Sequence, residues 1–376
     1  MIILRKKFRY LSLIIIVFLS FSFIASPVTS DGAHVSASGA ILIDNSTGRV
    51  LYSLNPHSRL PMASTTKIMT ALIAIEYGKL DEVVKIKKSC VGIEGSSIYL
   101  YNGEEITLRD IVYGLMLRSG NDAAVAIAIH ISGSVSNFAE LMNKKAKEIG
   151  ALNTNFKNPH GLHEKDHYTT AYDLALITRE AMKHNEFREI SKTKVWKADR
   201  ETNNYFYNKN KTLWQYEGGD GVKIGYTQVA GRCLVSSATR NGIQLIAVVL
   251  NDNNWFNDCY NLFDYGFENY KPTVIYSRSQ YIKMIQVING NEENIELITK
   301  NDLILPLKEE DKDKLKIHID TPQKISAPII KGQEVGNIKI YLEGQLVSCD
   351  KLIARDSVEE KNILDRVKGF ISNMFS

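Results

Sequence analysis

Apolar residues in the first two thirds of the chain form short runs bounded by turn residues and longer runs at helical spacing. Residues 39–54 predict a β-hairpin, because two apolar runs flank the turn sequence Asp-Asn-Ser-Thr-Gly. Three further strands are predicted by apolar runs at 221–227, 232–239 and 244–250. An Asn-Gly pair between the last two runs favours a tight turn there, so these two strands should be antiparallel neighbours.

Five helices are predicted between these two groups of strands. The first begins near Ser64, carries a broad apolar stripe and is expected to stop at Gly78. The second opens with a Thr-x-x-Asp capping box at Thr107 and Asp110. The helices are expected at about 64–76, 107–117, 122–131, 137–149 and 170–183. Strands at both ends with helices between them predict an α/β (α+β) domain, in which a helical cluster covers an antiparallel sheet.

The pattern changes near Pro272, so the first predicted domain covers residues 31–271. Residues 272–352 are expected to form a small β-rich domain, because strand-like runs alternate there with Asn, Gly and Asp turns. These runs lie at 281–288, 295–298, 315–319 and 338–342. In residues 353–376, apolar side chains recur at helical spacing and predict an amphipathic C-terminal helix. The helix could dock on the β-rich domain, but its terminal position favours a membrane-anchoring role at the interface.

Residues 1–30 have the pattern of an export signal, or signal peptide: basic residues, then an apolar stretch, then the small residues Val28-Thr-Ser30. The apolar stretch is short for a membrane span, which favours cleavage over an uncleaved anchor. The chain of 376 residues has 46 Lys and Arg against 42 Asp and Glu, and losing the four basic residues of the signal leaves 42 of each. This balance leaves no basic excess that would indicate a nucleic-acid partner.

Three short sequence signals indicate a serine acyl-transfer site. Ser64-x-x-Lys67 places a hydroxyl and an amine about one helical turn apart, where a partly desolvated lysine could take the serine proton. Ser119-Gly-Asn121 follows the second predicted helix, and Lys223-Ile-Gly225 lies on a predicted strand. Taken alone, Ser64 would be interpreted as a helix N-cap and the Ser119 segment as a cap and turn. All three signals in this order favour the catalytic interpretation.

The signals and their flanks resemble the penicillin-recognising serine enzymes, and more closely the D-alanyl-D-alanine carboxypeptidases (low-molecular-mass penicillin-binding proteins). The resemblance covers nearly the whole chain, and its segments are 62–70, 114–124, 158–162 and 220–227; residues 250–255 resemble the sporulation-associated branch. A β-rich second domain and a C-terminal amphipathic anchor belong to the family's plan. The resemblance implies an exported serine-type carboxypeptidase at the outer face of the cytoplasmic membrane. Such an enzyme would remove the terminal D-alanine from peptidoglycan pentapeptide stems and be acylated by β-lactam antibiotics.

In the mechanism implied by this resemblance, Ser64 attacks the carbonyl of the penultimate D-alanine and Lys67 takes the hydroxyl proton. Burial near a second cation would lower the pKa of Lys67, and Lys223 could be that cation while also attracting the terminal carboxylate of the substrate. Ser119 could relay the proton toward the leaving amine. Asn121 could hold both Lys67 and the substrate amide.

The strand that contains Lys223 is expected to flank the cleft. A peptide substrate could pair with it as an added strand, and Gly225 would keep this approach open. By resemblance, the oxyanion hole consists of the backbone N–H groups of Ser64 and Tyr226. The N-terminal end of the Ser64 helix would add a favourable dipole for the developing negative charge.

Two departures from the family pattern bear on activity. Ile224 stands where the family usually has a threonine whose hydroxyl is expected to bind the substrate carboxylate. Thr227, Lys209 or Lys211 would have to take over that contact. Residues 251–258 contain no arginine, although many relatives place one there. These departures leave an alternative open, in which the chain is a catalytically weakened penicillin-binding protein that binds the wall or acts as a scaffold.

Residue types that often hold metals also occur. His163-Glu-Lys-Asp-His167 matches the H-E-x-x-H zinc signature, which requires a helix, but its polar surroundings predict a loop. We therefore expect no metal or other cofactor, and a zinc peptidase stays an alternative. A β-lactamase is another alternative, although the Glu-x-x-Leu-Asn pattern of class A enzymes is missing, which implies a long-lived penicilloyl-enzyme. The four cysteines are widely spaced and predict buried thiols more than a disulfide framework: Cys90, Cys233, Cys259 and Cys349.

Overall fold

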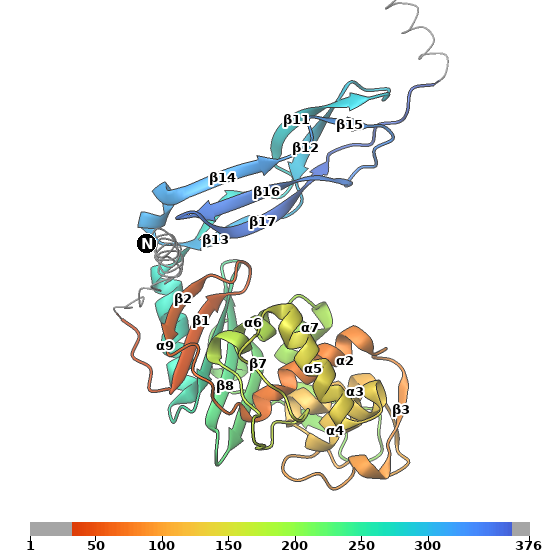
Figure 1. The fold of residues 1–376 in the computed structure, drawn as a ribbon, viewed down its shortest axis with the longest axis vertical. Helices are drawn as coiled ribbons and strands as arrows, with labels where there is room; N and C mark the ends of the chain where they lie inside the picture. The colour runs from red at the N-terminus through yellow and green to blue at the C-terminus, as the bar shows by residue number, and fades with distance from the viewer. Residues whose placement is uncertain (1–31, 363–376) are drawn as a thin grey trace, which may run out of the picture. The chain divides into compact units, whose positions relative to one another are not determined.

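A computed structural model describes residues 32–362 (Figure 1). The N-terminal hairpin and the three later strands form one five-stranded antiparallel sheet in the order β2-β1-β9-β8-β7. Its strands are β1 (Gly39–Asp44), β2 (Val50–Leu54), β7 (Gly219–Thr227), β8 (Gly231–Arg240) and β9 (Ile243–Leu250). β1 pairs with β9, with Ile41 opposite Val248, so strands far apart in the sequence meet inside the sheet. The predicted antiparallel sheet is confirmed, and β7 lies at one edge of it.

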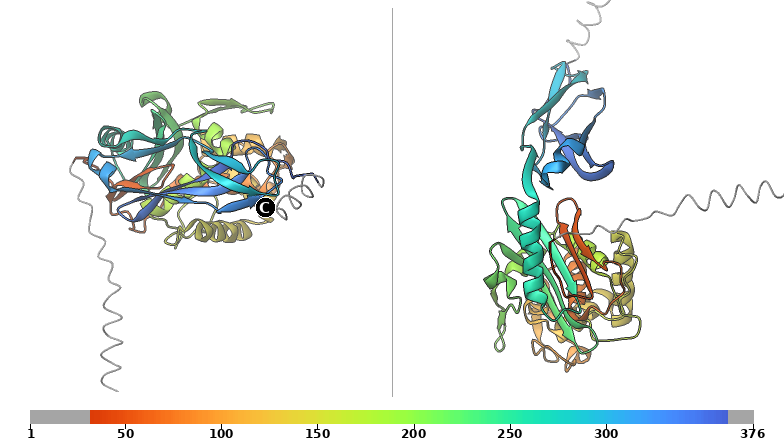
Figure 2. Two further views of the ribbon diagram at one scale, coloured as in Figure 1. Left: turned by 90° about the horizontal axis from the view of Figure 1, so that it is seen from above. Right: turned by 90° about the vertical axis from the view of Figure 1, so that its left-hand side faces the viewer.

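Apolar side chains cover both faces of this sheet, because alternate residues of a strand point to opposite sides. Ile41 and Ile43 pack into the core shared with the helical cluster, whereas Ala40 and Leu42 pack into a second core. The second core is closed by α9 (Trp255–Asn269), which packs along β8 and β9 (Figure 2). No helix is predicted from the sequence in this segment, so α9 is an addition to the expected architecture.

The helical cluster packs on the other face of the sheet (Figure 1). Its helices are α2 (Lys67–Tyr77), α3 (Leu108–Tyr113), α4 (Asn121–Ser132), α5 (Val135–Ile149), α6 (Ala171–Ala181) and α7 (Asn185–Lys192). The five predicted helices are confirmed to within a few residues, and α7 is additional. Thr107 caps α3 as predicted, since its side chain accepts a hydrogen bond from Asp110 N. The predicted second helix is not uniform, because a π-helical turn, η3 (Gly114–Arg118), continues α3.

Shorter elements complete this part of the chain. Two antiparallel pairs are formed by β3 (Val83–Lys85) with β4 (Glu105–Thr107) and by β5 (Val195–Lys197) with β6 (Tyr205–Tyr207). The remaining short helices are η1 (Ala63–Thr66), η2 (Lys88–Cys90) and α8 (Thr212–Gln215). In the described residues, no single helix is long and apolar enough to cross a membrane; a bent pair, α4 with α5, meets that test only by length and composition.

The C-terminal part is β-rich, as predicted. A six-stranded sheet has the order β14-β16-β17-β12-β11-β15, and β10 pairs with β13 in a separate two-stranded sheet. The elements are β10 (Lys271–Tyr276), β11 (Tyr281–Ile288), β12 (Asn294–Thr299), β13 (Leu303–Leu307), η4 (Glu309–Lys314), β14 (Leu315–Asp320), β15 (Lys324–Ser326), β16 (Glu334–Leu342) and β17 (Gln345–Ala354). The four predicted strands are confirmed. Val358 is buried in the same core and pairs with Ile329, so the packed chain continues past the expected limit at residue 352.

The export signal predicted at 1–30 and the part of the predicted C-terminal helix from 363 onward lie outside the described range. The prediction of a helix from residue 353 is wrong for residues 353–362, because β17 runs to Ala354 and Val358 forms a bridge with Ile329. The cysteine prediction can be compared with the structure. All four cysteines are free thiols; Cys90, Cys233 and Cys259 are buried as expected, whereas Cys349 is exposed.

Candidate active site

Ser64 lies in a 3₁₀ turn rather than in the first turn of an α-helix. The turn η1 spans Ala63–Thr66, and α2 begins at Lys67. In a 3₁₀ turn, residues i and i+3 lie almost directly above each other, which explains why Lys67 Nζ is 2.9 Å from Ser64 Oγ. The preceding residue, Ala63, has a left-handed φ of 46°, a strained conformation for alanine that turns the serine out of the helical path.

The ammonium group of Lys67 has three oxygen neighbours. Its Nζ lies 2.9 Å from Ser64 Oγ, 2.7 Å from Asn121 Oδ1 and 2.6 Å from the backbone oxygen of His160. The side chain is fully buried. The sequence predicts the contacts with Ser64 and Asn121, but it gives no role to His160, because a backbone carbonyl carries no residue-type signal.

The surroundings of Lys67 favour its neutral form. Burial, and next the like charge of Lys223, hold its pKa well below its usual range. Lys209 adds to the lowering, while Asp122 opposes it. A lysine held toward its neutral form can act as a base. The expected effect of Lys223 on Lys67 agrees with these causes.

Ser119 and Asn121 are presented from a tight turn between η3 and α4. Ser119 has a left-handed φ of 64°, which is uncommon for serine and ends the π-helical turn. Asn121 is the first residue of α4, and its side-chain amide donates a hydrogen bond to the backbone oxygen of Glu94. That contact orients the side-chain oxygen of Asn121 toward Lys67.

Lys223 reaches the site from β7. Its Nζ donates to Ser119 Oγ at 3.0 Å and to the backbone oxygen of Ile224 at 2.9 Å. Burial, and then repulsion by Lys209, lower the pKa of Lys223 to about 7. The hydrogen bonds thus form two groups, Ser64–Lys67–Asn121 and Ser119–Lys223. The charge of Lys223 couples the two groups, because it acts on Lys67.

Gly225 marks the place where β7 approaches the Ser64 turn. A Cβ at this residue would lie 2.8 Å from Ser64 N and 3.0 Å from Thr65 N, so only glycine leaves β7 and the turn at this spacing. Tyr226 follows on the same strand, opposite Arg232 of β8. The two residues whose N–H groups are expected to form the oxyanion hole thus lie on the two sides of one narrow gap.

The three residues that could replace the hydroxyl missing at Ile224 lie in different surroundings. Ile224 packs against the second core of the sheet, with its side chain on the α9 side. The hydroxyl of Thr227 accepts a hydrogen bond from Ala230 N at 3.0 Å, and Lys211 Nζ lies 5.9 Å from the centre of the Phe256 ring. Lys209 differs from both, because its charge is among the causes that lower the pKa values of Lys67 and Lys223.

The H-E-x-x-H segment is a loop, as predicted from its sequence. His167 is buried, and both of its ring nitrogens contact the protein: Nε2 lies 2.9 Å from Thr66 Oγ1, and Nδ1 accepts from Lys157 N at 3.0 Å. Burial, followed by the nearby charges of His163 and Lys67, lowers its pKa to about 4. Within residues 32–362, no cluster of three or more His, Cys, Asp or Glu side chains is arranged to hold a metal ion.

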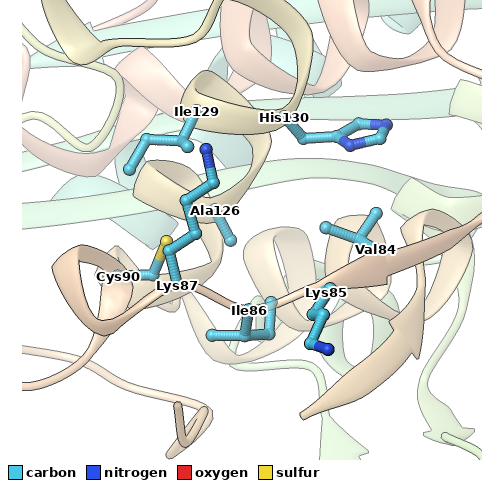
Figure 3. Close-up of a pocket in the computed structure, with 8 residues that line it drawn as sticks. All are labelled: Val84, Lys85, Ile86, Lys87, Cys90, Ala126, Ile129 and His130. Carbon is cyan, nitrogen blue, oxygen red and sulfur yellow. The ribbon is translucent and has the colours of Figure 1, made fainter. Parts of the chain in front are cut away.

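A separate cavity of about 150 Å³ lies between the β3 segment, η2 and α4 (Figure 3). Its lining consists of Val84, Lys85, Ile86, Lys87, Cys90, Ala126, Ile129 and His130. None of the predicted site residues belongs to this lining. The candidate active site is therefore distinct from this cavity.

Comparison with known protein families supports the resemblance seen in the sequence. A family model described as D-alanyl-D-alanine carboxypeptidase matches residues 26–254, and a model described as penicillin-binding protein 5, C-terminal domain, matches residues 270–360. The D-alanyl-D-alanine carboxypeptidase DacF of Bacillus subtilis (strain 168) is 37% identical over 351 residues, covering 90% of each chain. DacC of Escherichia coli (strain K12) is 32% identical over 370 residues, covering 93% of this chain and 91% of that protein.

Solved structures lead to the same family. Penicillin binding protein 5 from Haemophilus influenzae has a TM-score of 0.67 and 30% identity, over 88% of this chain and 100% of the other. PBP3 from Streptococcus pneumoniae, a peptidoglycan synthesis regulatory factor, has a TM-score of 0.75 at 23% identity over 87% of this chain, which supports the fold alone. The chain therefore belongs to the D-alanyl-D-alanine carboxypeptidase family and is a penicillin-binding serine DD-carboxypeptidase.

Proposed function

We propose that the chain removes the terminal D-alanine of peptidoglycan pentapeptide stems through an ester on Ser64. In acylation, Ser64 Oγ bonds to the carbonyl carbon of the penultimate D-alanine while Lys67 Nζ accepts the hydroxyl proton. The C–N bond then breaks, and the terminal D-alanine leaves with a proton passed through Ser119. In the second step, water hydrolyses the ester and releases the shortened peptide as a carboxylate.

The observation that carries this proposal is the environment of Lys67 Nζ. A neutral amine has two N–H groups and one lone pair. Asn121 Oδ1 and the backbone oxygen of His160 can accept the two N–H groups, at 2.7 and 2.6 Å. The lone pair then faces Ser64 Oγ at 2.9 Å, within reach of the proton that a general base must remove.

The substrate is proposed to lie along β7. A peptide can add to this edge strand through backbone hydrogen bonds, and Lys223 supplies a cation for the terminal carboxylate. The oxyanion would form between the backbone N–H groups of Ser64 and Tyr226. Since Ile224 offers no hydroxyl, Lys209 is the favoured second contact for the carboxylate, because its charge acts on both site lysines.

Covalent labelling with a fluorescent penicillin tests the role of Ser64. The wild-type protein should form a stable fluorescent adduct, and Ser64→Ala should form none. Ser348→Ala, in β17, is a matched control that should label like the wild type. Label on Ser64→Ala would contradict the proposed nucleophile, and rapid turnover of penicillin without persistent label would favour a β-lactamase.

A weakened enzyme that binds the wall or acts as a scaffold is the second candidate, and the substitution at Ile224 is the observation that favours it. Release of D-alanine from a defined pentapeptide separates the two candidates. The carboxypeptidase proposal expects release that Ser64→Ala abolishes. A zinc peptidase would instead lose activity with a chelator and keep it with penicillin.

We also propose that the chain acts on the outer side of the cytoplasmic membrane, held there by the amphipathic C-terminal segment. Because Val358 packs in the β-rich core, a truncation that tests this should follow residue 362. The truncated protein is expected to be soluble and active, whereas the full chain should sediment with membranes. Sedimentation of both proteins would place the anchor elsewhere.

A further inference from the structure

A group of exposed tyrosines lies beside the turn that presents Ser119 and Asn121, and it takes no part in the proposed chemistry. Tyr99 is 62% exposed, Tyr205 50% and Tyr207 56%; these three residues are called the tyrosine surface below. Tyrosine combines a flat apolar ring with a polar hydroxyl, so several exposed rings together indicate a binding surface.

Two of these rings are set by the short β5–β6 hairpin. Trp196 and Phe206 pair across it and turn inward, where Phe206 is fully buried. Alternation along the strands therefore turns Tyr205 and Tyr207 outward. Their ring centres are 6.5 Å apart and their planes differ by 28°, so the hairpin presents two nearly parallel rings on one face.

The third tyrosine, Tyr99, has a strained backbone conformation. Its φ of 62° lies in the left-handed region, which is rare for a bulky residue. Asp122 holds the loop on both sides of it, accepting hydrogen bonds from Ile98 N and Leu100 N. Arg200 donates to the backbone oxygen of Tyr99 at 3.1 Å. The surrounding contacts thus maintain the strain, which is common at functional sites.

Tyr99 and the β5–β6 hairpin lie close to each other and to the turn that presents Ser119 and Asn121. Tyr99 and Tyr205 line one small depression of about 40 Å³ together with Arg118. Arg118 directly precedes Ser119, and Asp122 directly follows Asn121. A ligand on the tyrosine surface would therefore lie next to the residues that present the catalytic serine and asparagine.

We propose that the tyrosine surface binds the polysaccharide backbone to which the peptide substrate is attached. The C–H faces of sugar rings would pack on the tyrosine rings, while Arg118 and the phenol hydroxyls bond to sugar oxygens. This inference rests on the proposed function, in which the peptide occupies the cleft. An extended pentapeptide spans at most about 18 Å, so the sugars stay near the enzyme when the peptide end is at Ser64.

A lysine beside the surface argues against the core of a protein interface, where tyrosine and arginine are otherwise common. Lys197 lies opposite Tyr205 in the hairpin, with its Nζ 5.9 Å from the ring centre. Lysine is depleted from the cores of protein interfaces. The backbone that carries Tyr99 is also held in place before binding, which lowers the entropy cost of capturing a flexible polymer.

The test compares one peptide in two forms, free and attached to glycan strands. The double variant Tyr205→Ala/Tyr207→Ala should lower kcat/KM for the glycan-linked form by about tenfold, or about 1.4 kcal/mol. Hydrolysis of the free pentapeptide and acylation by penicillin should be unchanged. Tyr281→Ala, a 51% exposed tyrosine in β11, is the control and should change neither substrate. Equal effects of the double variant on both forms, or no effect, would overturn the inference.

Binding without catalysis gives a second readout. Glycan strands stripped of their peptides should bind the wild-type protein and the Tyr281→Ala control, but bind the double variant weakly. This measurement does not depend on Ser64, so failure of the proposed function would not affect it. Absence of wild-type binding to the stripped strands would overturn the inference and leave a protein partner as the explanation for the exposed rings.

Discussion

Replacing Gly225 by alanine would place a methyl group in the narrow gap between β7 and the Ser64 turn. Its Cβ would lie 2.8 Å from Ser64 N, 3.0 Å from Thr65 N and 3.1 Å from Ala63 Cβ. Ordinary van der Waals contact starts at 3.4 Å, so β7 or the turn has to move by about 0.6 Å, the difference between 3.4 and 2.8 Å. Two of the three obstructing atoms belong to the backbone, so a side-chain rotation cannot relieve the clash.

This movement would separate the N–H groups of Ser64 and Tyr226, the proposed oxyanion hole. Losing one donor of such a hole raises the barrier by about 2.7–4 kcal/mol and slows the reaction by about 10²–10³-fold. The three atoms nearest to a Cβ at Gly225 belong to Ala63, Ser64 and Thr65, and none of them to Lys67. Gly225→Ala is therefore expected to slow acylation while the folded state persists.

The assay is the rate of labelling by fluorescent penicillin, measured together with the melting temperature. Gly344→Ala, between β16 and β17, is the control, because an added Cβ there meets nothing within 4 Å. Its positive φ of 83° adds backbone strain, so it also shows whether modest destabilisation alone affects labelling. A labelling rate of Gly225→Ala within about threefold of the wild type, at an unchanged melting temperature, would refute the reasoning.

Four further predictions concern Lys223, Ile224 and Asp252. The pKa of Lys223 is lowered to about 7, so kcat/KM for a peptide with a free terminal carboxylate should fall as the pH rises through about 7. Lys223→Arg should abolish this fall, and a peptide with a terminal amide should not show it. The folded protein loses this proton near 7 and the unfolded chain near 10.5, so the free energy of unfolding should rise with pH between these values, and a denaturant titration that shows no rise would contradict this. Because the side chain of Ile224 lies on the α9 side of the sheet, Ile224→Thr should change kcat/KM for the pentapeptide by less than about threefold; a tenfold rise, the worth of a hydrogen bond of about 1.5 kcal/mol to a charged group, would contradict this placement. Burial, and the nearby Asp258 carboxylate, raise the pKa of Asp252, so the stability present at low pH is lost as the pH rises through the folded-state pKa; Asp252→Asn should raise the melting temperature at pH 8 by about 2–4 °C, and an equal gain at pH 4 would contradict this cause.

The fold could be predicted where side-chain periodicity is strong. The hairpin, the three later strands and the five helices follow from apolar spacing and capping residues, as at Thr107. Helix α9 was missed although Phe256, Cys259 and Phe263 are buried on one side of it. It follows a polar Asn-Asp-Asn-Asn segment and is rich in aromatic residues, which have only modest helix propensity. Packing on β8 and β9 stabilises this helix, and such tertiary packing cannot be read from the helix propensities of its residues.

The site was predictable as a set of side chains but not as a geometry. The motifs identify Ser64, Lys67, Ser119, Asn121 and Lys223, and the structure brings these five together. The backbone conformations that orient these side chains cannot be read from residue type, because Ala63 and Ser119 have a left-handed φ that alanine and serine rarely adopt. The backbone carbonyl of His160, which accepts from Lys67, has no sequence signal either, since every residue has a backbone carbonyl.

The concentration of positive charge around the cleft has a consequence for how the protein behaves in ordinary buffers. Lys223 is buried near Lys209 while Lys67 is held toward its neutral form, so the charges of Lys223 and Lys209 should attract small anions to the place meant for the substrate carboxylate. Acetate, phosphate or sulfate would then compete weakly with peptide, and more strongly below pH 7, where Lys223 holds its proton. An apparent KM for the peptide would therefore include the displacement of a buffer anion, and its value would depend on the salt chosen.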